Sequence, residues 1–567
     1  MAVIVKRLAN KKTRRETGLD FVVGKLNLQT PFGKSRVREQ KPFLPGQEDE
    51  LNRELDRVQI MMDLYRDHER DVTLLQEILM MVKDNSLTLE RSEKSILSVV
   101  EIFELKSLLL QMEKLIRISG GGEIKLESGC CDGPDRGTAK VEGMRLPEEY
   151  IPEDTSALLD ILDPGHDRLN TFYVYDTFSE KLAELRKEKK ELEKESRRAK
   201  KQRKNEIREQ YGINLTPKFD ITVSKADDES VKMIQEISGL TKSEEDYMSV
   251  TFSLTSTDAD EEIARRMDDL TMEIEEEEQV VLQRLSKEIS KYKDVIQANC
   301  DRIGALDMTL AKAIYAVKTS CTRPEIAQEH VLEFTEGRHL QAEEIIKSHG
   351  GTYCPVSLSL KDGVTCITGA NMGGKTISLK LTGMVAILAQ YGYFVPAESA
   401  RVGLSNFMQI LIGDSQSIER GLSSFGSEME ELKEIMDNGK PRSLLLIDEI
   451  ASGTNPVEGL ALTRSVIDYL KPKEYISLIT THFDAVTYDP DIVHMQVTGL
   501  ANADFTKLDR EIRYANRKER IQVIRKYMDY RLRRVESSQE IPKDALNIAK
   551  MLGISKDIID KAKEYMN

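Results

Sequence analysis

A glycine-rich segment at 369–376 has the residue types and the spacing of a phosphate-binding loop. A β-branched run, VTCIT at 364–368, comes directly before it. A phosphate-binding loop has a Gly, then any four residues, then Gly-Lys followed by Ser or Thr. Residues 369–376 match this pattern in full, and they are Gly369, Ala370, Asn371, Met372, Gly373, Gly374, Lys375 and Thr376. Such glycines let backbone N–H groups approach a phosphate, and the following helix adds the positive end of its dipole. We therefore expect Lys375 to bridge the β- and γ-phosphates of ATP, and Thr376 to bind Mg²⁺.

Two carboxylates and a histidine follow later strand-like runs. Asp448 and Glu449 come after the run SLLLI (443–447), and His482 comes after the run YISLIT (475–480). Asp448 is predicted to hold Mg²⁺ through water, and Glu449 is predicted to orient and activate the attacking water. His482 follows the next strand and is predicted to sense the γ-phosphate.

A third motif lies between the phosphate loop and the carboxylate pair. The segment SSFGSEM (423–429) places Ser, Gly and Phe immediately before a helical pattern, and a helix N-terminus can bind a phosphate. Its position is that of the signature loop of ABC-type ATPases, which contacts the γ-phosphate of the opposite subunit. Ser423 is the residue expected to act there.

The composition limits the class of protein that carries these motifs. The chain has 567 residues, a net charge of −15, 40% apolar residues and only 6% aromatic residues, which favours long solvated helices. No apolar run of about eighteen residues and no secretory leader are present, so we expect a cytoplasmic protein without membrane contact. Six cysteines without a C-x₂-C pair predict neither a disulfide framework nor structural zinc. The acidic balance argues against a large nucleic-acid-binding surface, but not against a local basic patch.

Hydrophobic periodicity predicts the elements that must position the motifs. Two charged amphipathic runs are expected to form the arms of a coiled coil, since apolar residues recur in them at heptad spacing. Short β-branched runs alternating with helical stretches predict a nucleotide-binding sheet after Pro324. The expected parts are a segment of uncertain structure (1–50), a helical core with lever and clamp (51–330, arms 178–210 and 258–302, tip 211–257), an ATPase domain (331–500) and a C-terminal helical region (501–567).

The two arms carry opposite charge. Residues 186–204 contain eleven Lys or Arg and four Glu, whereas the returning arm is rich in Asp and Glu, with four consecutive glutamates at 275–278. Opposite charges on flanking positions set the orientation of paired helices. We therefore expect the basic run to be partly neutralised by the returning arm.

Taken together, the motifs resemble the ATPase domain of the MutS family, whose members are ABC-type ATPases. The matching segments, in order, are GRH (337–339), TGANMGGKT, SSFGSEM, LLLIDEIASGTNP and TTHF. LDMTLAKAIYA (306–316) is similar to the core helix before that domain, and residues 544–566 resemble its C-terminal dimerisation element. The resemblance implies an α/β P-loop ABC-type ATPase domain, an all-α core with long coiled-coil lever arms, a small β clamp tip and a C-terminal helical dimerisation element.

The resemblance also implies roles for individual residues. The loop from Gly369 to Thr376, including Asn371 and Met372, would bind ATP, and Thr376 and Asp448 would hold Mg²⁺. Glu449 and His482 would be catalytic, and Ser423 would act on the partner subunit's nucleotide. Tyr353, just upstream of the first strand, would stack on adenine.

The sequence departs from the mismatch-repair members in three places. Only residues 1–50 precede the core, in place of a mismatch-reading domain and a connector, and they lack the Phe-x-Glu motif that wedges into a mismatch. No Smr-type nuclease, as found in the shortened branch of the family, follows before Asn567. An additional basic helix is expected at 507–534. Its cations are Arg510, Arg513, Arg517, Lys518, Arg520, Arg525, Lys526, Arg531, Arg533 and Arg534.

These departures leave three hypotheses for function. The first is a dimeric clamp, as a homodimer or with a related subunit, that encloses duplex nucleic acid weakly and without reading mismatches, through phosphate contacts at the tip and the 507–534 helix. The second is the ATPase subunit of a reactivating chaperone whose protein client is a cobalamin-dependent lysine aminomutase. The third, a scaffold that does not hydrolyse ATP, is disfavoured because Asp448, Glu449 and His482 are intact.

Overall fold

The structure is a computed structural model. In it the chain divides into two units. Residues 1–80 and 303–567 make the sheet unit, and residues 81–302 make the arm unit. The boundary falls inside helix α12 (Lys293–Lys318). The described residues are 8–120, 123–125, 138–140, 144–369, 374–413, 424–483, 486, 489–500, 503–514, 519–535, 546, 549, 551 and 553–565.

Two sheets organise the sheet unit. The larger has the order β11-β12-β13-β9-β14-β15, with β15 antiparallel to its neighbour and all other neighbours parallel. The smaller has the order β6-β10-β7-β8. The strands are β6 (Glu325–Ala327), β7 (Val331–Gly337), β8 (Val356–Lys361), β9 (Gly363–Thr368), β10 (Ser399–Gly403), β11 (Phe407–Leu411), β12 (Ser443–Asp448), β13 (Tyr475–Thr480), β14 (Val493–Gly499) and β15 (Asp529–Arg534).

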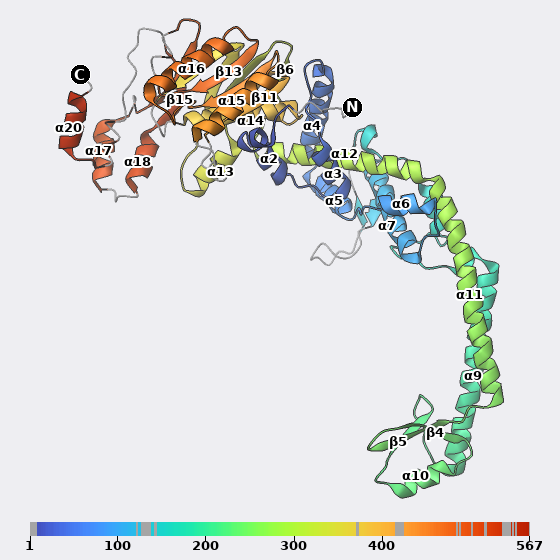
Figure 1. The fold of residues 1–567 in the computed structure, drawn as a ribbon. Coiled ribbons are helices and arrows are strands. Elements are labelled where there is room, and N and C mark those ends of the chain that lie inside the picture. Colours follow the sequence, from blue (N-terminus) through green and yellow to red (C-terminus); the bar gives the residue numbers. More distant parts are fainter. Residues whose placement is uncertain are drawn as a thin grey trace. The chain divides into compact units, whose positions relative to one another are not determined.

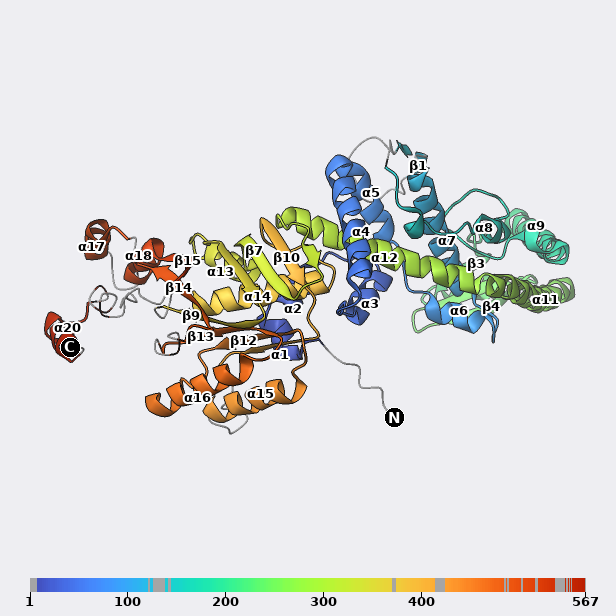
Figure 2. The ribbon, with the colours of Figure 1, turned by 90° about the horizontal axis from the view of Figure 1, so that it is seen from above.

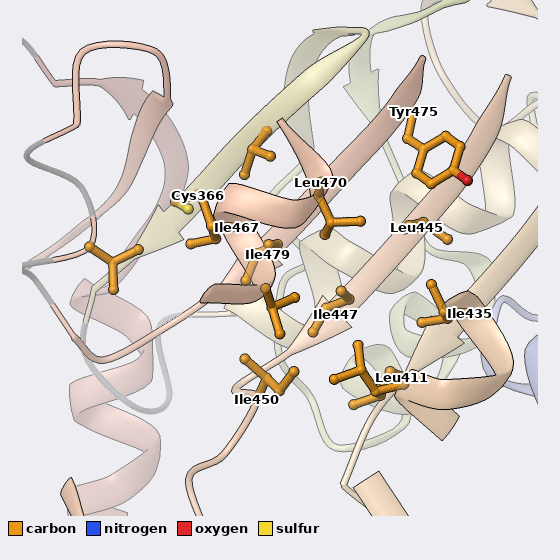
Figure 3. Close-up of a cluster of buried hydrophobic side chains, with 14 of the residues drawn as sticks. Cys366, Leu411, Ile435, Leu445, Ile447, Ile450, Ile467, Leu470, Tyr475 and Ile479 are labelled. Carbon is orange, nitrogen blue, oxygen red and sulfur yellow. The ribbon is translucent and has the colours of Figure 1, made fainter. Parts of the chain in front are cut away.

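Helices cover both faces of the larger sheet (Figure 2). Leu445 and Ile447 point from β12 into a buried cluster with side chains of α15 and α16, among them Ile435 and Ile467 (Figure 3). The residue between them, Leu446, faces α14 on the other side, as the alternation of a strand requires. The helices of this unit are α1 (Lys11–Glu16), α2 (Leu19–Lys25), α3 (Pro31–Glu39), α4 (Glu48–Asp67), α5 (Glu69–Met80), α13 (Leu340–Ser348), α14 (Lys375–Gln390), α15 (Ser424–Asn438), α16 (Pro456–Leu470), α17 (Phe505–Tyr514), α18 (Glu519–Tyr527) and α20 (Lys556–Glu564).

The N-terminal segment, whose structure the sequence left open, is folded onto the sheet unit from Leu8 onward. The amide of Met408 in β11 donates to the carbonyl of Leu8 at 2.8 Å. Farther along, the buried carboxylate of Asp307 in α12 accepts hydrogen bonds from the amide and the hydroxyl of Thr30, at 2.7 and 2.8 Å. The segment thus joins the outer strand of the larger sheet to the core helix.

The arm unit contains a helical bundle, two long helices and a small sheet (Figure 1). Helix α7 begins with a capping box between Ser98 and Glu101 and supplies much of the bundle core. The elements are α6 (Ser86–Ser92), α7 (Val99–Ser119), β1 (Glu123–Lys125), β2 (Thr138–Lys140), a 3₁₀ turn (Glu148–Tyr150), α8 (Ser156–Leu162), a second 3₁₀ turn (Asp176–Phe178), α9 (Glu180–Tyr211), β3 (Asp220–Ser224), α10 (Asp228–Gln235), β4 (Leu240–Glu245), β5 (Ser249–Leu254) and α11 (Asp258–Lys291).

Helices α9 and α11 form an antiparallel pair joined mainly by polar contacts. Within α9 only Leu182, Leu185 and Ile207 are buried. The ion pairs run in opposite chain directions, and they are Lys181 with Glu277 at 3.1 Å, Arg186 with Glu278 at 2.6 Å, Glu188 with Arg266 at 2.9 Å and Arg203 with Asp260 at 2.6 Å. The predicted neutralisation of the basic run is therefore present, but only part of the run takes part in it.

The helix of the returning arm has a one-residue break within its predicted range. Helix α11 ends at Lys291, Tyr292 lies outside the α-helical region, and α12 begins at Lys293. The tip holds a three-stranded sheet in the order β3-β5-β4, in which β5 pairs with both β3 and β4. Its core is formed by eight buried residues: Ile207, Ile213, Leu215, Ile234, Ile237, Leu240, Val250 and Phe252.

The basic region at 507–534 is not one helix, so this prediction is wrong. It holds two short helices, α17 and α18, and the strand β15, which pairs with β14. Leu508, Ile512 and Ile524 are buried in a small apolar cluster between them. The region is therefore a folded extension of the larger sheet. Among the described residues, no helix is long and apolar enough to cross a membrane.

The ion pairs between the arms lead to a prediction with a matched control. Replacing Glu277 and Glu278 by Lys removes the contacts to Lys181 and Arg186 and places like charges together. Two partly exposed pairs and the new repulsion are expected to cost about 1–2 kcal/mol, which speeds local amide exchange roughly 5–30-fold. The same change at Glu275 and Glu276, which are exposed, should have little effect. Hydrogen–deuterium exchange of 180–190 measures both, and equal responses would contradict the pairing.

Candidate functional site

The parallel register of three strands brings the predicted site residues together. Strand β13 lies between β12 and β9, with Asp448 opposite Thr480 and Thr480 opposite Ile367. The three strands therefore end at one level, which is the edge where open α/β sheets bind ligands. Gly369 and Glu449 follow the ends of β9 and β12 directly, and His482 is the second residue after the end of β13.

Lys375 lies at the centre of the cluster. Its side chain is 3% exposed, and its Nζ donates to the carbonyl of Gly369 at 2.8 Å. The same nitrogen lies 3.3 Å from Oε1 of Glu449 and 3.3 Å from Nδ1 of His482. His482 Nε2 in turn lies 2.8 Å from Oε2 of Glu449. Lysine, glutamate and histidine thus form a closed ring of contacts at the first turn of α14.

Asp448 is held in a second set of hydrogen bonds beside this ring. Thr376 donates its hydroxyl to one carboxylate oxygen at 2.8 Å, and Thr480 donates to the other at 2.5 Å. The paired hydroxyl and carboxylate oxygens of Thr376 and Asp448 are hard ligands of the kind that Mg²⁺ prefers. Thr480 was within a quoted motif, yet sequence reasoning did not select it, because a Thr at a strand end carries no signal of its own.

The side chain of Glu449 has a lowered pKa, and its backbone has a positive φ. The hydrogen bond to His482, together with the charge of Lys375, holds the pKa of Glu449 below its usual range, although burial acts in the opposite direction. The carboxylate is therefore ionised at neutral pH. Its φ of 49° lies in the left-handed region, as does that of Ala451 at 58°, which costs about 1–3 kcal/mol for residues other than glycine. The amide of Glu449 is fixed by the carbonyl and the hydroxyl of Thr480, each at 3.1 Å.

Helix α15 is tied to the same turn. Glu428, which lies in α15 and within the segment SSFGSEM, accepts a hydrogen bond from the amide of Ala451 at 3.1 Å. Burial raises the pKa of Glu428. This contact links the turn after Glu449 to the start of α15, and nothing in the sequence pattern indicated it.

Five of the predicted residues lie outside the described part of the chain. They are Ala370, Asn371, Met372 and Gly373 of the loop, and Ser423. Gly374, which is described, has a φ of 82° and caps α14 in the left-handed region that favours glycine. A Cβ atom at Gly374 would lie 2.9 Å from the ring of Tyr530 in β15. Tyr530 is thus an aromatic residue beside the phosphate loop that sequence reasoning missed.

Tyr353 is buried in this structure and hydrogen-bonds to the backbone at the start of α13. Its side chain is 9% exposed, and its hydroxyl accepts a hydrogen bond from the amide of His339 at 3.0 Å. Burial raises the pKa of Tyr353 to about 12. His339 caps α13 through its Nδ1, and burial lowers its pKa to about 4. Stacking of Tyr353 on adenine stays a prediction.

Residues 365–567, which carry this site, match the family model of MutS domain V. In this part the chain is thus similar to members of the MutS family. The protein named Endonuclease MutS2 from Fusobacterium nucleatum is 36% identical over 222 residues, which are 39% of this chain and 28% of that protein.

Two further relatives match longer stretches of the chain. Endonuclease MutS2 from Caldanaerobacter subterraneus is 30% identical over 305 residues, covering 52% of this chain and 35% of that protein. DNA mismatch repair protein MutS from Carboxydothermus hydrogenoformans is 30% identical over 286 residues, covering 50% and 32%. The chain thus spans only about a third of the length of these MutS relatives.

The N-terminal segment braces MutS domain V on two sides. Lys12 in α1 donates to the carbonyl of Ile412 at 3.0 Å and pairs with Glu431 of α15 at 2.6 Å. Glu16, one turn later, pairs with Lys380 of α14 at 2.7 Å. Helix α1 therefore connects the helix after the phosphate loop to the helix after the predicted signature loop.

Lys12→Met should release one side of this brace. Charge-assisted hydrogen bonds contribute about 1.5–3 kcal/mol each, so we expect faster amide exchange in 407–412 and in α15, together with a lower melting temperature. Lys11→Met removes the same charge from the exposed neighbouring position and serves as the control. Equal effects of the two variants would show that the contacts of Lys12 do not brace the domain.

Proposed function

We propose that the chain is a Mg²⁺-dependent ATP hydrolase that works as a nucleotide-driven dimeric clamp and does not read mismatches. The observation that carries the proposal is the ring formed by Lys375, Glu449 and His482 next to the Thr376–Asp448 pair. Phosphoryl transfer to water requires three kinds of group. They are a cation at a helix N-terminus, oxygen ligands for Mg²⁺ from a hydroxyl and a carboxylate, and an ionised carboxylate near the attacking water.

The roles follow from the chemistry of each side chain. Lys375 and the first turn of α14 bind the β- and γ-phosphates, while Thr376 and Asp448 hold Mg²⁺. Bound Mg²⁺ neutralises charge that develops on the phosphate oxygens. Glu449 orients the attacking water and accepts its proton, and His482 positions Glu449 and contacts the γ-phosphate. Since the pKa of Glu449 is lowered, its contribution comes more from orientation than from basicity.

Dimerisation completes the site in this proposal. Ser423 would contact the γ-phosphate bound by the opposite subunit, and the C-terminal residues would join the subunits as a homodimer or with a related chain. Duplex nucleic acid is the favoured occupant of the clamp, because one relative reported above is named a DNA mismatch repair protein and the other two are named endonucleases. None of those three is named as a reactivating factor, so the protein-client alternative has less support.

Glu449→Gln should keep ATP binding and nearly abolish hydrolysis. The phosphate and Mg²⁺ ligands remain, whereas loss of one acid–base group typically costs about 10²–10⁴-fold. Nucleotide binding and phosphate release, measured on the same preparation, separate the two effects. Glu458→Gln, at an exposed position of α16, is the matched control. Turnover close to that of the unmodified protein would move the catalytic role elsewhere, and His482→Ala would be tested next.

Action of Ser423 across the dimer can be tested by mixing two inactive variants. Lys375→Ala removes phosphate binding from its own site, and Ser423→Ala removes the residue given to the partner's site. A mixed dimer contains one site with both defects and one with neither, so mixing should restore turnover that neither variant shows alone. If Ser423 acts on its own subunit's nucleotide, every site in the mixture is defective and no activity returns.

A further inference from the structure

The two ends of the predicted phosphate loop lie against one pair of strands. A Cβ atom at Gly369 would lie 3.1 Å from Cβ of Val497 in β14, and one at Gly374 would lie 2.9 Å from Cδ1 of Tyr530 in β15. Strands β14 and β15 are antiparallel neighbours, and β15 is the edge strand of the larger sheet. Both described ends of the loop are therefore in close contact with side chains of the same two-stranded ribbon.

Tyr530 lies at an irregularity of this ribbon. The register shifts between Val497 and Gly499 of β14, which are separated by Thr498 alone. Their partners on β15 are separated by two residues, Tyr530 and Arg531. Two residues opposite one is the arrangement of a β-bulge, which changes the direction of a side chain and is over-represented next to active sites. The hydroxyl of Thr498 donates to the carbonyl of Arg531 at 2.9 Å and so fixes the bulged strand.

Gly374 has little else to hold its backbone conformation. It is the N-cap of α14 with a φ of 82°, and no side chain caps this end of the helix. Glycine adopts several backbone conformations with similar ease, so holding it in one costs more conformational entropy than for any other residue. The ring of Tyr530 occupies the space that a side chain at Gly374 would fill. The ring therefore restricts the conformations open to the residue directly before Lys375.

The side chain of Tyr530 is supported on its other side by the C-terminal extension of the sheet. Tyr530 packs against the buried apolar cluster that contains Leu508, Ile512 and Ile524 of α17 and α18. Its backbone amide donates to the thiol of Cys354, which opposes the effect of burial in raising the pKa of that thiol. Backbone and ring of Tyr530 are thus both held in place.

We propose that Tyr530 is a positioning residue for nucleotide binding. Its ring holds Gly374 in the conformation from which the first amides of α14 and Nζ of Lys375 meet the phosphates. A loop that is already ordered binds more tightly, because less of the ordering cost falls on the binding step. Glu449 and Asp448 have no part in this contact, so the chemical step keeps its groups. The inference rests on the proposed ATP hydrolysis and names a residue outside its chemistry.

The test compares two tyrosines that pack against the same apolar cluster. Tyr530→Ala removes the ring beside Gly374, whereas Tyr527→Ala is the matched control, since the three atoms nearest to a Cβ at Gly374 all belong to Tyr530. Tyr530→Phe keeps the ring. Titration with a fluorescent ATP analogue and Mg²⁺ gives the affinity, phosphate release gives KM and kcat, and thermal melting shows that each full-length variant is folded.

We expect Tyr530→Ala to weaken nucleotide binding and to raise KM about 5–30-fold, with kcat changed by less than about threefold. Tyr530→Phe and Tyr527→Ala should bind nucleotide like the unmodified protein. A general loss of stability would not separate KM from kcat in this way. Leu variants at the same two positions keep an apolar side chain in the cluster, and they are compared in the same way if an Ala variant does not fold.

Two results would overturn the inference. One is an equal affinity of the Tyr530 and Tyr527 variants, and the other is a loss in Tyr530→Phe as large as that in Tyr530→Ala. An unmodified protein that neither binds nor hydrolyses ATP would instead contradict the proposed function itself, and this inference with it. The measurements on the unmodified protein therefore distinguish the two failures.

Discussion

The confinement of helix α14 is the constraint on which the rest of the sheet unit depends. Thirteen of its sixteen residues are buried, and a helix that is apolar on all sides must be enclosed on all sides. The neighbouring side chains approach α14 closely at Gly383, since a Cβ atom there would lie 2.5 Å from Thr17 and 2.8 Å from Leu446. The N-terminal segment and the sheet thus hold α14 between them, and the N-terminus of this helix is where the phosphate loop ends.

The other end of α14 is fixed by a buried charge. Lys312 of α12 is fully buried and lies 2.9 Å from Glu54 of α4, 3.4 Å from the carbonyl of Tyr391, and over the ring of Tyr393. Although burial raises it, the pKa of Glu54 is held below its usual range by Lys312. Removing one partner of a buried pair typically costs about 3–5 kcal/mol, because the other charge is left uncompensated. A displacement of α14 along its axis would therefore act directly on α12 and α4.

How much the sequence could predict depends on the range of the interactions involved. The convergence of Lys375, Asp448, Glu449 and His482 was predictable, because each follows the end of a strand and parallel strands bring such ends together. The two long helices were predictable from heptad spacing. The contacts of Lys12, Glu428 and Tyr530 were not predictable, because each of these residues acts through a partner far away in the chain, which no local pattern reveals.

Two departures from the expected helices have local causes. The α11–α12 junction carries apolar residues at helical spacing straight through Tyr292, so only the backbone at that residue, with φ −97° and ψ 3°, separates the two helices. In the 507–534 region, the many Arg and Lys residues favoured a prediction of one solvated helix. The segment DYRLRR instead forms strand β15, which pairs with β14. In both cases charge and hydropathy were compatible with one long helix, and tertiary packing decided against it.

The geometry of the ring explains how one small site can influence the elements around it. Lys375, Glu449 and His482 contact each other, and in the proposed function all three lie next to the γ-phosphate. In that proposal, a phosphate contact made by one of them would compete with its contacts to the other two. Glu449 is followed by a strained turn whose amide at Ala451 is held by Glu428 of α15, and α15 is held by Lys12 through Glu431. A rearrangement within the ring thus has a continuous path of polar contacts from the sheet edge to α15 and the N-terminal segment, and this path lies entirely within the sheet unit.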